Sequence, residues 1–327
     1  MNNKKKNKKR IILIPVLLCI FVIAGVLAVT LIPGLKLRFV RAYQKMRIPG
    51  IVCIGDSLTH GTGEEGTDYP SVLKNQLESH EIYIPVVNMG VGGENTVTIG
   101  GRMGGIPFKL NEFTIPSGIE ETPISFIDSK DKEVTPLIAG FDRGMNPCKV
   151  MGVEGNITID EDRNYYFTRK KEGRETPVPK ETEVETFAGK EYRDYIFVLF
   201  MGENGGYRDT EELIRQQQMI IDKQRKNKDK FIIIGLTTGS EESRKEQDSA
   251  MQEKWGEHYL NIRKYLCEYA LDECLENLSE KDVEKCKKGT VPKYLRIDDI
   301  HYNDLGYRIL AEAVYEKLEK LGYIETN

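Results

Sequence analysis

Apolar runs that alternate with amphipathic segments predict a parallel sheet covered by helices. Runs of apolar and β-branched residues predict buried strands at 51–54, 82–88, 195–201 and 231–236, with a short strand at 259–262. Apolar positions at helical spacing predict helices at 69–79, 210–225 and from Asn303 or Asp304 to Leu321, the last one ended by Gly322. Strands that are apolar throughout are typical of a parallel sheet buried on both faces, so we expect an α/β fold.

One long stretch between the second and third strands departs from this pattern. Residues 97–191 are rich in Thr, Pro, Gly and short alternating apolar runs, and they contain no convincing helix. We interpret them as a β-rich insertion within a domain formed by residues 49–327. A long disordered loop is the alternative, which the aromatic and β-branched content disfavours.

The amino end has an organisation of its own. Residues 1–10 hold six of the 47 basic residues and no acidic one, which predicts a cytoplasmic tail. Residues 11–33 follow as an uncharged apolar segment that is long enough to cross a bilayer, so we expect a single-pass anchor in the cell membrane with an extracytoplasmic domain. The alternative is a cleaved signal and a secreted protein, since Val26 and Ala28 have the small-residue spacing of a cleavage site.

The next segment, residues 34–48, mixes five basic residues with apolar ones and contains no acidic residue. This composition suits a basic juxtamembrane stalk that lies near lipid headgroups, and an ordinary solvated linker fits it as well. Without the first ten residues, the chain has 41 basic against 51 acidic residues, which disfavours nucleic-acid binding. The six cysteines show neither CxxC nor Cys/His spacing, so we expect no metal or other cofactor and mostly free, buried thiols.

Candidate catalytic residues follow the predicted strands. The first strand ends in Gly-Asp-Ser, which places Ser57 on a sharp turn. The second strand runs into NMGVGGENT at 88–96, and the third runs into GENGG at 202–206. Near the carboxyl end, Asp298 precedes His301 by three residues, a spacing from which a carboxylate can fix the tautomer of an imidazole. A serine needs such a base to act as a nucleophile at neutral pH.

These four blocks, in this order and at these positions, resemble those of the SGNH hydrolases, also called the GDSL esterase/lipase superfamily. The resemblance covers residues 48–323 apart from the insertion, and it implies a flavodoxin-like three-layer α/β/α sandwich. It also implies a catalytic triad with Ser57 as the nucleophile, His301 as the general base and then acid, and Asp298 as the orienting carboxylate.

The resemblance further implies an oxyanion hole. Its donors would be the backbone N–H groups of Ser57 and Gly93 and the side-chain amide of Asn204, with Gly92 as the alternative to Gly93. The third block departs from the usual GxND pattern of the family, because Gly205 follows Asn204. The loop that holds this asparagine is therefore expected to be positioned differently.

Four further residues are candidates for the pocket: Asp56, His60, Gly92 and Arg102. A structural hydrogen bond is the alternative role for His60. Arg102 lies in GGRMGG at 100–105, which we interpret as a hinge into the insertion, and its side chain is expected either to meet an anionic substrate or to be solvated.

Together these observations predict an extracytoplasmic serine esterase that forms an acyl-enzyme on Ser57. The expected substrates are O-acyl esters, especially O-acetyl esters of carbohydrates, with lipid esters and thioesters as alternatives. An O-acetyltransferase with the same triad is the rival activity. A catalytically inactive glycan-binding or scaffold protein is the rival from a different class.

Overall fold

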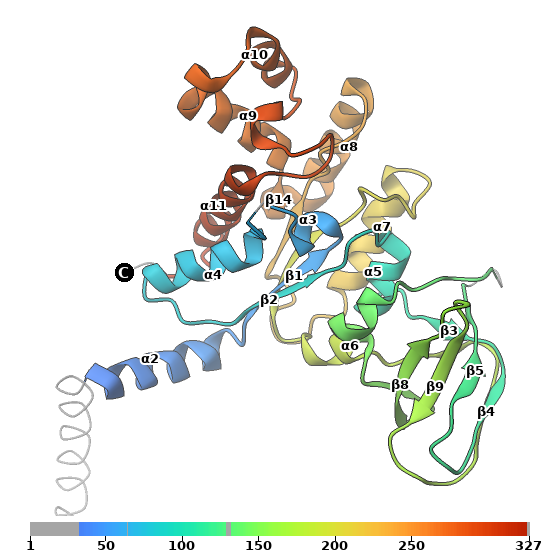
Figure 1. Cartoon of the computed structure of the whole chain (residues 1–327). Helices are drawn as coiled ribbons and strands as arrows, with labels where there is room; N and C mark the ends of the chain where they lie inside the picture. Colours follow the sequence, from blue (N-terminus) through green and yellow to red (C-terminus); the bar gives the residue numbers. More distant parts are fainter. Residues whose placement is uncertain (1–32, 64, 129–131, 326–327) are drawn as a thin grey trace, which may run out of the picture.

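A central five-stranded sheet organises the chain, of which the computed structural model describes residues 33–63, 65–128 and 132–325 (Figure 1). The strands lie in the order β14 (Tyr259–Leu260), β13 (Phe231–Ile234), β12 (Ile196–Phe200), β1 (Ile51–Gly55) and β2 (Val86–Gly90), and every pairing is parallel. Numbered by their order along the chain, these strands follow the flavodoxin-like arrangement 2-1-3-4-5. The predicted α/β fold with a parallel sheet is confirmed.

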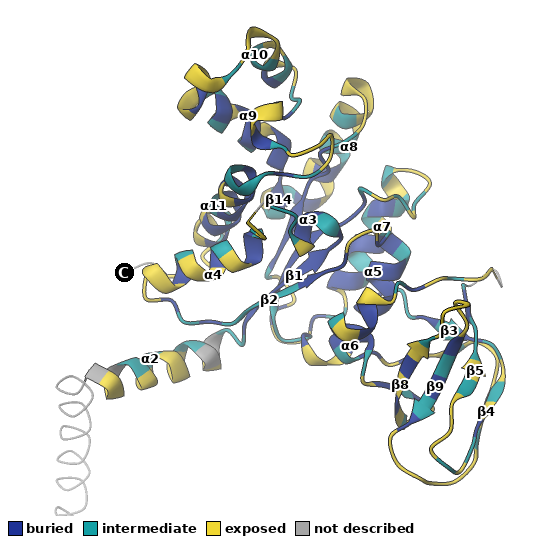
Figure 2. Ribbon diagram, viewed as in Figure 1, coloured by how far each residue is buried: buried dark blue, intermediate teal, exposed yellow. Residues whose placement is uncertain are grey.

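Helices cover both faces of the sheet because successive strand residues point to opposite sides. Ile51 and Cys53 lie in one buried cluster with α4 (Tyr69–Ser79), α9 (Ile262–Glu273) and α11 (Asp304–Lys320). Val52 and Ile54 lie in a second cluster with α5 (Thr96–Arg102), α7 (Thr210–Ile221) and α8 (Glu241–Trp255). Strands β1, β12, β13 and β14 are accordingly buried at every position, whereas the edge strand β2 is half-buried at its first three residues (Figure 2). Sheet and helices form three layers.

Side-chain caps fix where the main helices begin. Asp68 accepts a hydrogen bond from the Ser71 N–H at 2.8 Å at the start of α4, and Pro70 occupies the first turn, where it costs no hydrogen bond. Asn303 caps α11 by accepting from the Gly306 N–H. The predicted helix at 69–79 is confirmed at both ends. Helix α8 was not predicted, because its hydrophobic pattern is weak and only Met251 and Trp255 are buried in it.

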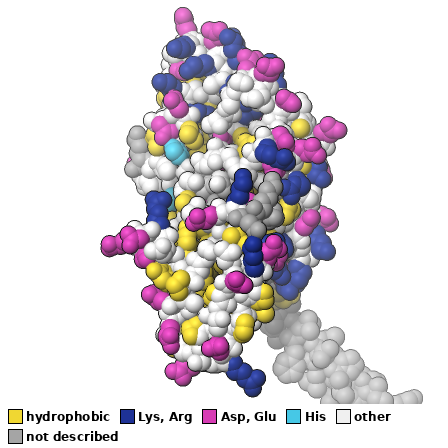
Figure 3. Space-filling view, turned by 90° about the vertical axis from the view of Figure 1, so that its right-hand side faces the viewer, with side chains coloured by type: hydrophobic (Ala, Val, Ile, Leu, Met, Phe, Trp, Pro, Cys, Tyr) yellow, Lys and Arg dark blue, Asp and Glu magenta, His cyan; other side chains and the backbone are white. Residues whose placement is uncertain are grey.

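The β-rich insertion has a hydrophobic core of its own, centred on Phe126, Tyr165 and Phe167. Its strands pair only antiparallel. They are β3 (Lys109–Leu110), β4 (Phe113–Ile115), β5 (Thr122–Ile124), β6 (Phe126–Ile127), β7 (Cys148–Val150), β8 (Val153–Ile159), β9 (Tyr165–Arg169), β10 (Thr176–Val178) and β11 (Thr182–Glu183). Figure 3 faces this side and shows hydrophobic side chains in separate patches over its lower part, among charged groups of both signs.

The expectation that residues 97–191 contain no convincing helix is wrong at both ends of the stretch. Helix α5 begins at Thr96, where Asn95 caps it through the N–H groups of Val97 and Thr98, and α6 (Phe187–Glu191) closes the stretch. A short π-helical turn, η1 (Phe141–Met145), lies between them. Helix α5 is hard to recognise in the sequence because two of its seven residues are glycines.

The segment before the sheet is helical. Helix α2 (Pro33–Arg47) covers nearly all of the predicted stalk at 34–48. The predicted tail at 1–10 and the predicted anchor at 11–33, apart from Pro33, lie outside the described residues. Within residues 33–63, 65–128 and 132–325, no helix has both the length and the apolar character that crossing a bilayer requires. The five cysteines in these ranges are free and buried, as expected.

Candidate active site

The nucleophile candidate lies where β1 ends. Gly55 closes the strand, Asp56 follows, and Ser57 is the first residue of the four-residue helix α3 (Ser57–His60). Asp56 caps this helix, because its Oδ1 accepts the Leu58 N–H at 3.0 Å. The turn thus presents a half-buried Ser57 at the carboxyl end of the sheet, where ligands of open α/β folds bind.

His301 and Asp298 reach this serine from the loop before α11. The Nε2 atom of His301 lies 2.9 Å from Ser57 Oγ, and its Nδ1 lies 2.7 Å from Asp298 Oδ2. The other oxygen of Asp298 accepts the backbone N–H groups of Ile300 and His301 at 2.7 and 2.6 Å. The carboxylate therefore holds both the imidazole and its loop. This geometry can perform nucleophilic acyl transfer.

The pKa of the Asp298 carboxyl is lowered in the folded protein, which suits a carboxylate that pairs with His301. Partial burial by itself would raise the pKa of this carboxyl, but the hydrogen bonds from the His301 side chain and from two backbone N–H groups outweigh burial and lower the pKa to about 2. Asp298 consequently stays ionised at any pH above about 3. A permanently charged partner favours the imidazolium that forms when His301 accepts the serine proton.

Two of the predicted oxyanion donors are backbone N–H groups at turns, those of Ser57 and Gly93. Gly90 at the end of β2 lies so close to α3 that a Cβ atom there would be 2.1 Å from the His60 nitrogen, so only glycine fits. The turn after it exposes Gly92 and Gly93, and Gly93 has a φ of +80°, which glycine adopts without strain. Within the described structure the Gly93 N–H makes no backbone hydrogen bond. The Gly93 N–H, on an exposed turn, is therefore a candidate donor to a substrate oxygen.

The third predicted donor, Asn204, follows β12 and is tied to the same turn. One N–H of its side-chain amide donates to the Glu94 carbonyl oxygen at 3.0 Å, and the Thr96 N–H donates to the Gly205 carbonyl at 3.0 Å. An asparagine amide has two N–H bonds, so the second can point to the substrate. Gly205 has a φ of +71°, which gives a physical reason for glycine at the position where the family pattern has aspartate.

We predict that Asn204→Ala lowers kcat by about 10²-fold to 10³-fold, because one preorganised donor to the oxyanion is lost. KM should change much less, since that charge develops only in the transition state. Steady-state kinetics on a soluble acetyl ester would measure both constants. Asn164→Ala, in the exposed loop before β9, is the matched control and should leave kcat unchanged. A normal kcat for Asn204→Ala would contradict its oxyanion role.

Comparisons with known proteins find similarity at the level of structure. No family model matches the sequence, and no curated protein matches it. The structure is similar to a lipase/acylhydrolase from Enterococcus faecalis (14% identity, 85% of this chain and 98% of that chain, TM-score 0.41) and to an acetyl xylan esterase, AlAXEase (14%, 82% and 98%, TM-score 0.43). It is also similar to a peptidoglycan O-acetylesterase (12%, 88% and 94%, TM-score 0.36).

Sequence reasoning missed two residues that brace the triad loops. Glu203 accepts hydrogen bonds from the hydroxyls of Thr237 and Thr238 at 2.8 and 2.5 Å, which joins the Asn204 loop to the end of β13. The guanidinium of Arg296 donates to the carbonyl oxygens of Asp299 and Thr237. The loop that carries Asp298 is thereby held against the same strand end. No local sequence pattern indicates these partners, because in three of the four contacts the two residues are 34 or more positions apart.

Of the four pocket candidates, Asp56 and Arg102 are buried away from any pocket, His60 is exposed, and only Gly92 adjoins Ser57. Asp56 is fully buried under the nucleophile turn and does not line a pocket. Burial raises the pKa of its carboxyl to about 7, the hydrogen bond from Leu58 offsets part of this, and the nearby Glu203 and Glu94 raise it further. His60 is exposed at the end of α3, and its backbone carbonyl accepts from Asn88. Gly92 adjoins the nucleophile, since a Cβ there would lie 3.8 Å from that of Ser57.

The prediction for Arg102 is wrong. Its side chain is fully buried and neither solvated nor available to a substrate. The guanidinium pairs with Glu94 at 2.6 Å and donates to the carbonyl oxygens of Met89 and Arg143 at 2.8 Å each. Of the GGRMGG run, Gly100, Gly101 and Arg102 form the last turn of α5, and Met103, Gly104 and Gly105 form the turn that follows the helix. Arg102 thus clamps the turn that carries Gly93.

The insertion reaches this same turn. A Cβ built on Gly93 would lie 3.5 Å from Leu137 Cδ1, and Arg143 donates to the Gly90 carbonyl at 3.2 Å. Ile138, next to Leu137, exposes 64% of its surface. The segment 137–145, which includes η1, therefore borders the turn that carries Gly92 and Gly93. Its side chains are placed to contact a substrate bound at that turn.

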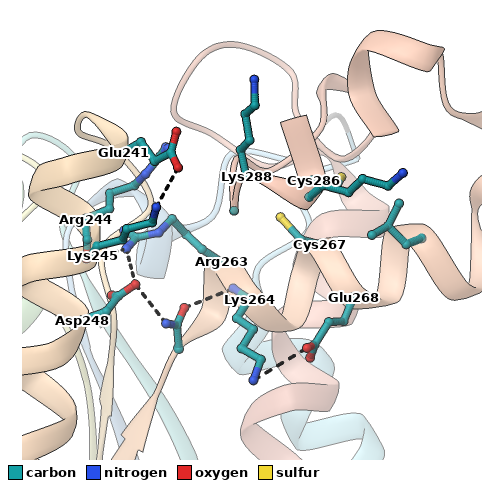
Figure 4. A pocket seen from close by; sticks show the side chains of 14 residues that line it. Glu241, Arg244, Lys245, Asp248, Arg263, Lys264, Cys267, Glu268, Cys286 and Lys288 are labelled. Carbon is teal, nitrogen blue, oxygen red and sulfur yellow. Dashed lines mark hydrogen bonds and ion pairs between the residues drawn. The ribbon is translucent and has the colours of Figure 1, made fainter. Parts of the chain in front are cut away.

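A cavity elsewhere has no catalytic residue in its lining. It lies between α8, α9 and α10 (Glu280–Lys287), and most of its charges are paired, as in Lys245 with Glu241 at 2.8 Å and Arg263 with Asp248 at 2.6 Å (Figure 4). Burial raises the pKa of the Cys267 thiol in its wall to about 12, so this thiol is a poor nucleophile. Among the described residues no group of three or more His, Cys, Asp or Glu side chains could hold a metal ion.

Proposed function

We propose that this protein is a serine esterase that hydrolyses O-acyl esters. The observation that carries the proposal is the chain of contacts from Asp298 through His301 to Ser57, with distances of 2.7 and 2.9 Å. A serine at the end of a buried strand, a base within hydrogen-bond reach and an oriented carboxylate are the parts that acyl transfer through a serine requires.

The mechanism follows from the contacts. His301 Nε2 accepts the Ser57 proton while Oγ attacks the ester carbonyl carbon, and the carbonyl oxygen gains a negative charge. The N–H groups of Ser57, Gly93 and Asn204 stabilise that charge. The imidazolium then protonates the leaving alcohol, which leaves the acyl group on Oγ. Water enters, gives its proton to His301 and attacks the acyl carbon, which releases the carboxylic acid and restores the serine.

The proposed substrates are O-acetyl esters on carbohydrate. Gly92, Gly93 and Asn204 are exposed, and the Asp298 side chain is 52% exposed, so the reacting centre is open to a bulky chain. An open centre suits a small acyl group on a polymer better than it suits a long acyl chain, which would need an enclosed apolar cavity. The exposed Ile138 beside the oxyanion turn offers an apolar surface on which a sugar ring can rest.

We also propose that the catalytic domain lies outside the cell membrane, held by the apolar segment at 11–33. The uncharged length of this segment and the basic cluster before it support this placement. Secretion after cleavage is the alternative, and the two differ in whether the purified native protein still contains residues 1–28, which cleavage after Ala28 would remove.

Labelling with a serine-directed fluorophosphonate tests the proposed chemistry. Wild-type protein should be labelled, because the probe phosphonylates an activated serine, and Ser57→Ala should not be labelled. Ser71→Ala removes an exposed serine whose hydroxyl bonds to Asp68 and should be labelled like wild type. Equal labelling of wild type and Ser57→Ala, or of neither, would refute the assignment. Release of acetate from an acetylated glycan without a sugar acceptor would then favour the hydrolase over the transferase.

A further inference from the structure

Helix α2 has one face on the body of the protein and one face that is exposed among the described residues. At the edge between the two faces, Phe39 and Tyr43 border a groove that Ile82, Ile84 and Tyr323 also line. On the covered face, the Gln44 side chain donates to the Glu81 carbonyl at 3.1 Å and accepts the Tyr83 N–H at 2.9 Å. The Arg41 guanidinium stacks over the Tyr83 ring at 4.7 Å. These contacts set the rotation of the helix against the segment between α4 and β2.

The uncovered face is apolar. Leu35, Phe39, Tyr43 and Met46 recur at spacings of four, four and three residues, which places them along one side of the helix. They expose 39%, 60%, 51% and 81% of their surface. Four of the large hydrophobic residues that the described chain exposes therefore lie on one helix of 15 residues (Figure 2).

We propose that this face of α2 lies in the interface of an anionic lipid bilayer. The sequence places 22 uncharged residues, 11–32, immediately before the helix, and as a helix this length would span about 33 Å, enough for the hydrocarbon core. Helix α2 therefore begins where the chain would leave the bilayer. Apolar side chains at this depth contact the acyl boundary, while the helix axis runs along the surface.

The charge of α2 favours lipid headgroups over a second copy of the chain as the occupant. The helix sequence contains five basic residues and no acidic one, and Arg38 and Arg41 are exposed. Two such helices packed face to face would bring like charges together, whereas each basic residue near an anionic leaflet contributes about 1 kcal/mol of attraction.

This docking would also set the direction of the active site. The Ile51 N–H at the start of β1 donates to the Pro85 carbonyl, so β1 begins beside the segment that α2 contacts. The strand then runs five residues, about 16 Å, before the turn that carries Ser57. The catalytic end of the sheet therefore faces away from the lipid. This consequence rests on the proposed esterase function, and it favours esters on polymers outside the membrane over esters of bilayer lipids.

Fluorescence quenching on the full-length chain in vesicles tests the proposal. The chain has a single tryptophan, Trp255, which is 5% exposed and supplies a shielded baseline. Phe39→Trp adds a reporter to the apolar face, and Tyr294→Trp adds one to an exposed position next to the catalytic loop. The vesicles contain phosphatidylcholine and phosphatidylglycerol with bromine on the acyl chains near the headgroup, and acrylamide is the aqueous quencher.

The expected result is loss of most of the fluorescence added by Phe39→Trp in brominated vesicles, while Tyr294→Trp responds only to acrylamide. A Phe39→Trp signal quenched by acrylamide alone would show a solvated helix and overturn the proposal. If the Phe39→Trp reporter were shielded from both quenchers, α2 would pack against protein, and the membrane proposal would be overturned as well. Quenching of Tyr294→Trp by the brominated lipid would overturn the inferred direction of the active site. Fluorophosphonate labelling of the same samples reports the esterase chemistry separately, so failure of one does not imply failure of the other.

Discussion

Alanine at Ser57 or at His301 is expected to lower kcat by on the order of 10⁶-fold, and the double variant should be no slower than either single one. The two side chains act in one proton transfer across the 2.9 Å between Oγ and Nε2, so removing either atom abolishes the same step. Residual turnover should come from the oxyanion donors and from binding. Initial rates on a sugar acetate would be measured for the wild-type protein, the two single variants and the double variant at equal concentration. Together they form a double-mutant cycle.

An unrelated serine and histidine provide the control for this cycle. Ser79 and His80 lie within 3.3 Å of each other at the end of α4, away from the turn that carries Ser57. Alanine at either position should leave turnover unchanged. If the losses at Ser57 and His301 multiplied in the double variant, the two residues would act in separate steps, and the triad mechanism would be wrong.

Exchange of Arg102 for methionine is expected to destabilise the fold by about 3–5 kcal/mol, because the Glu94 carboxylate would remain buried without its cation. The carbonyl oxygens of Met89 and Arg143 would lose a donor as well. Glu94 directly follows Gly93, and its carbonyl holds Asn204, so kcat should also fall in the protein that remains folded. Thermal or urea unfolding followed by circular dichroism gives the free energy, and kinetics below the transition give kcat.

A double variant tests whether the lower stability of Arg102→Met comes from the unpaired Glu94 carboxylate. Arg102→Met combined with Glu94→Leu removes both charges and should recover part of the lost stability. The exposed pair of Lys170 and Glu154 has the same 2.6 Å separation, so Lys170→Met is a control that differs chiefly in burial and should change stability little. Equal effects of Arg102→Met and Lys170→Met would contradict the clamp role of Arg102.

The parts of the fold that the sequence predicted well are those whose hydrophobic pattern is local. Strand β1 is apolar at every position because helices cover both sides of it, and this produces a continuous apolar run that any reader of the sequence can recognise. Helix α4 has a cap, a proline in its first turn and apolar residues at helical spacing, so its bounds follow from neighbouring residues. Helix α8 lacks such a pattern, since its exposed surface is wide and its buried residues are few.

The candidate site was predicted to the extent that its residues occur in short blocks. Ser57, and the pair Asp298 and His301, stand in turns whose chemistry is visible within a few positions. The role of Arg102 was not visible, because its burial depends on Glu94, on α5 and on the distant segment around Arg143. A buried ion pair is decided by everything that packs around it, and local sequence carries little of that information.

The sequence by itself determined the α/β class, the order along the chain of the five strands of the sheet, and the identity of the candidate serine, histidine and aspartate. These depend on hydrophobic periodicity, capping and turn residues, which act over fewer than about ten positions. Only the tertiary structure decided that His301 lies 2.9 Å from Ser57, that Arg102 is buried against Glu94 and that, among the described residues, one apolar face of α2 is exposed. Each of these results from contacts between segments far apart in the chain, whose distances are set by the packing of the whole core.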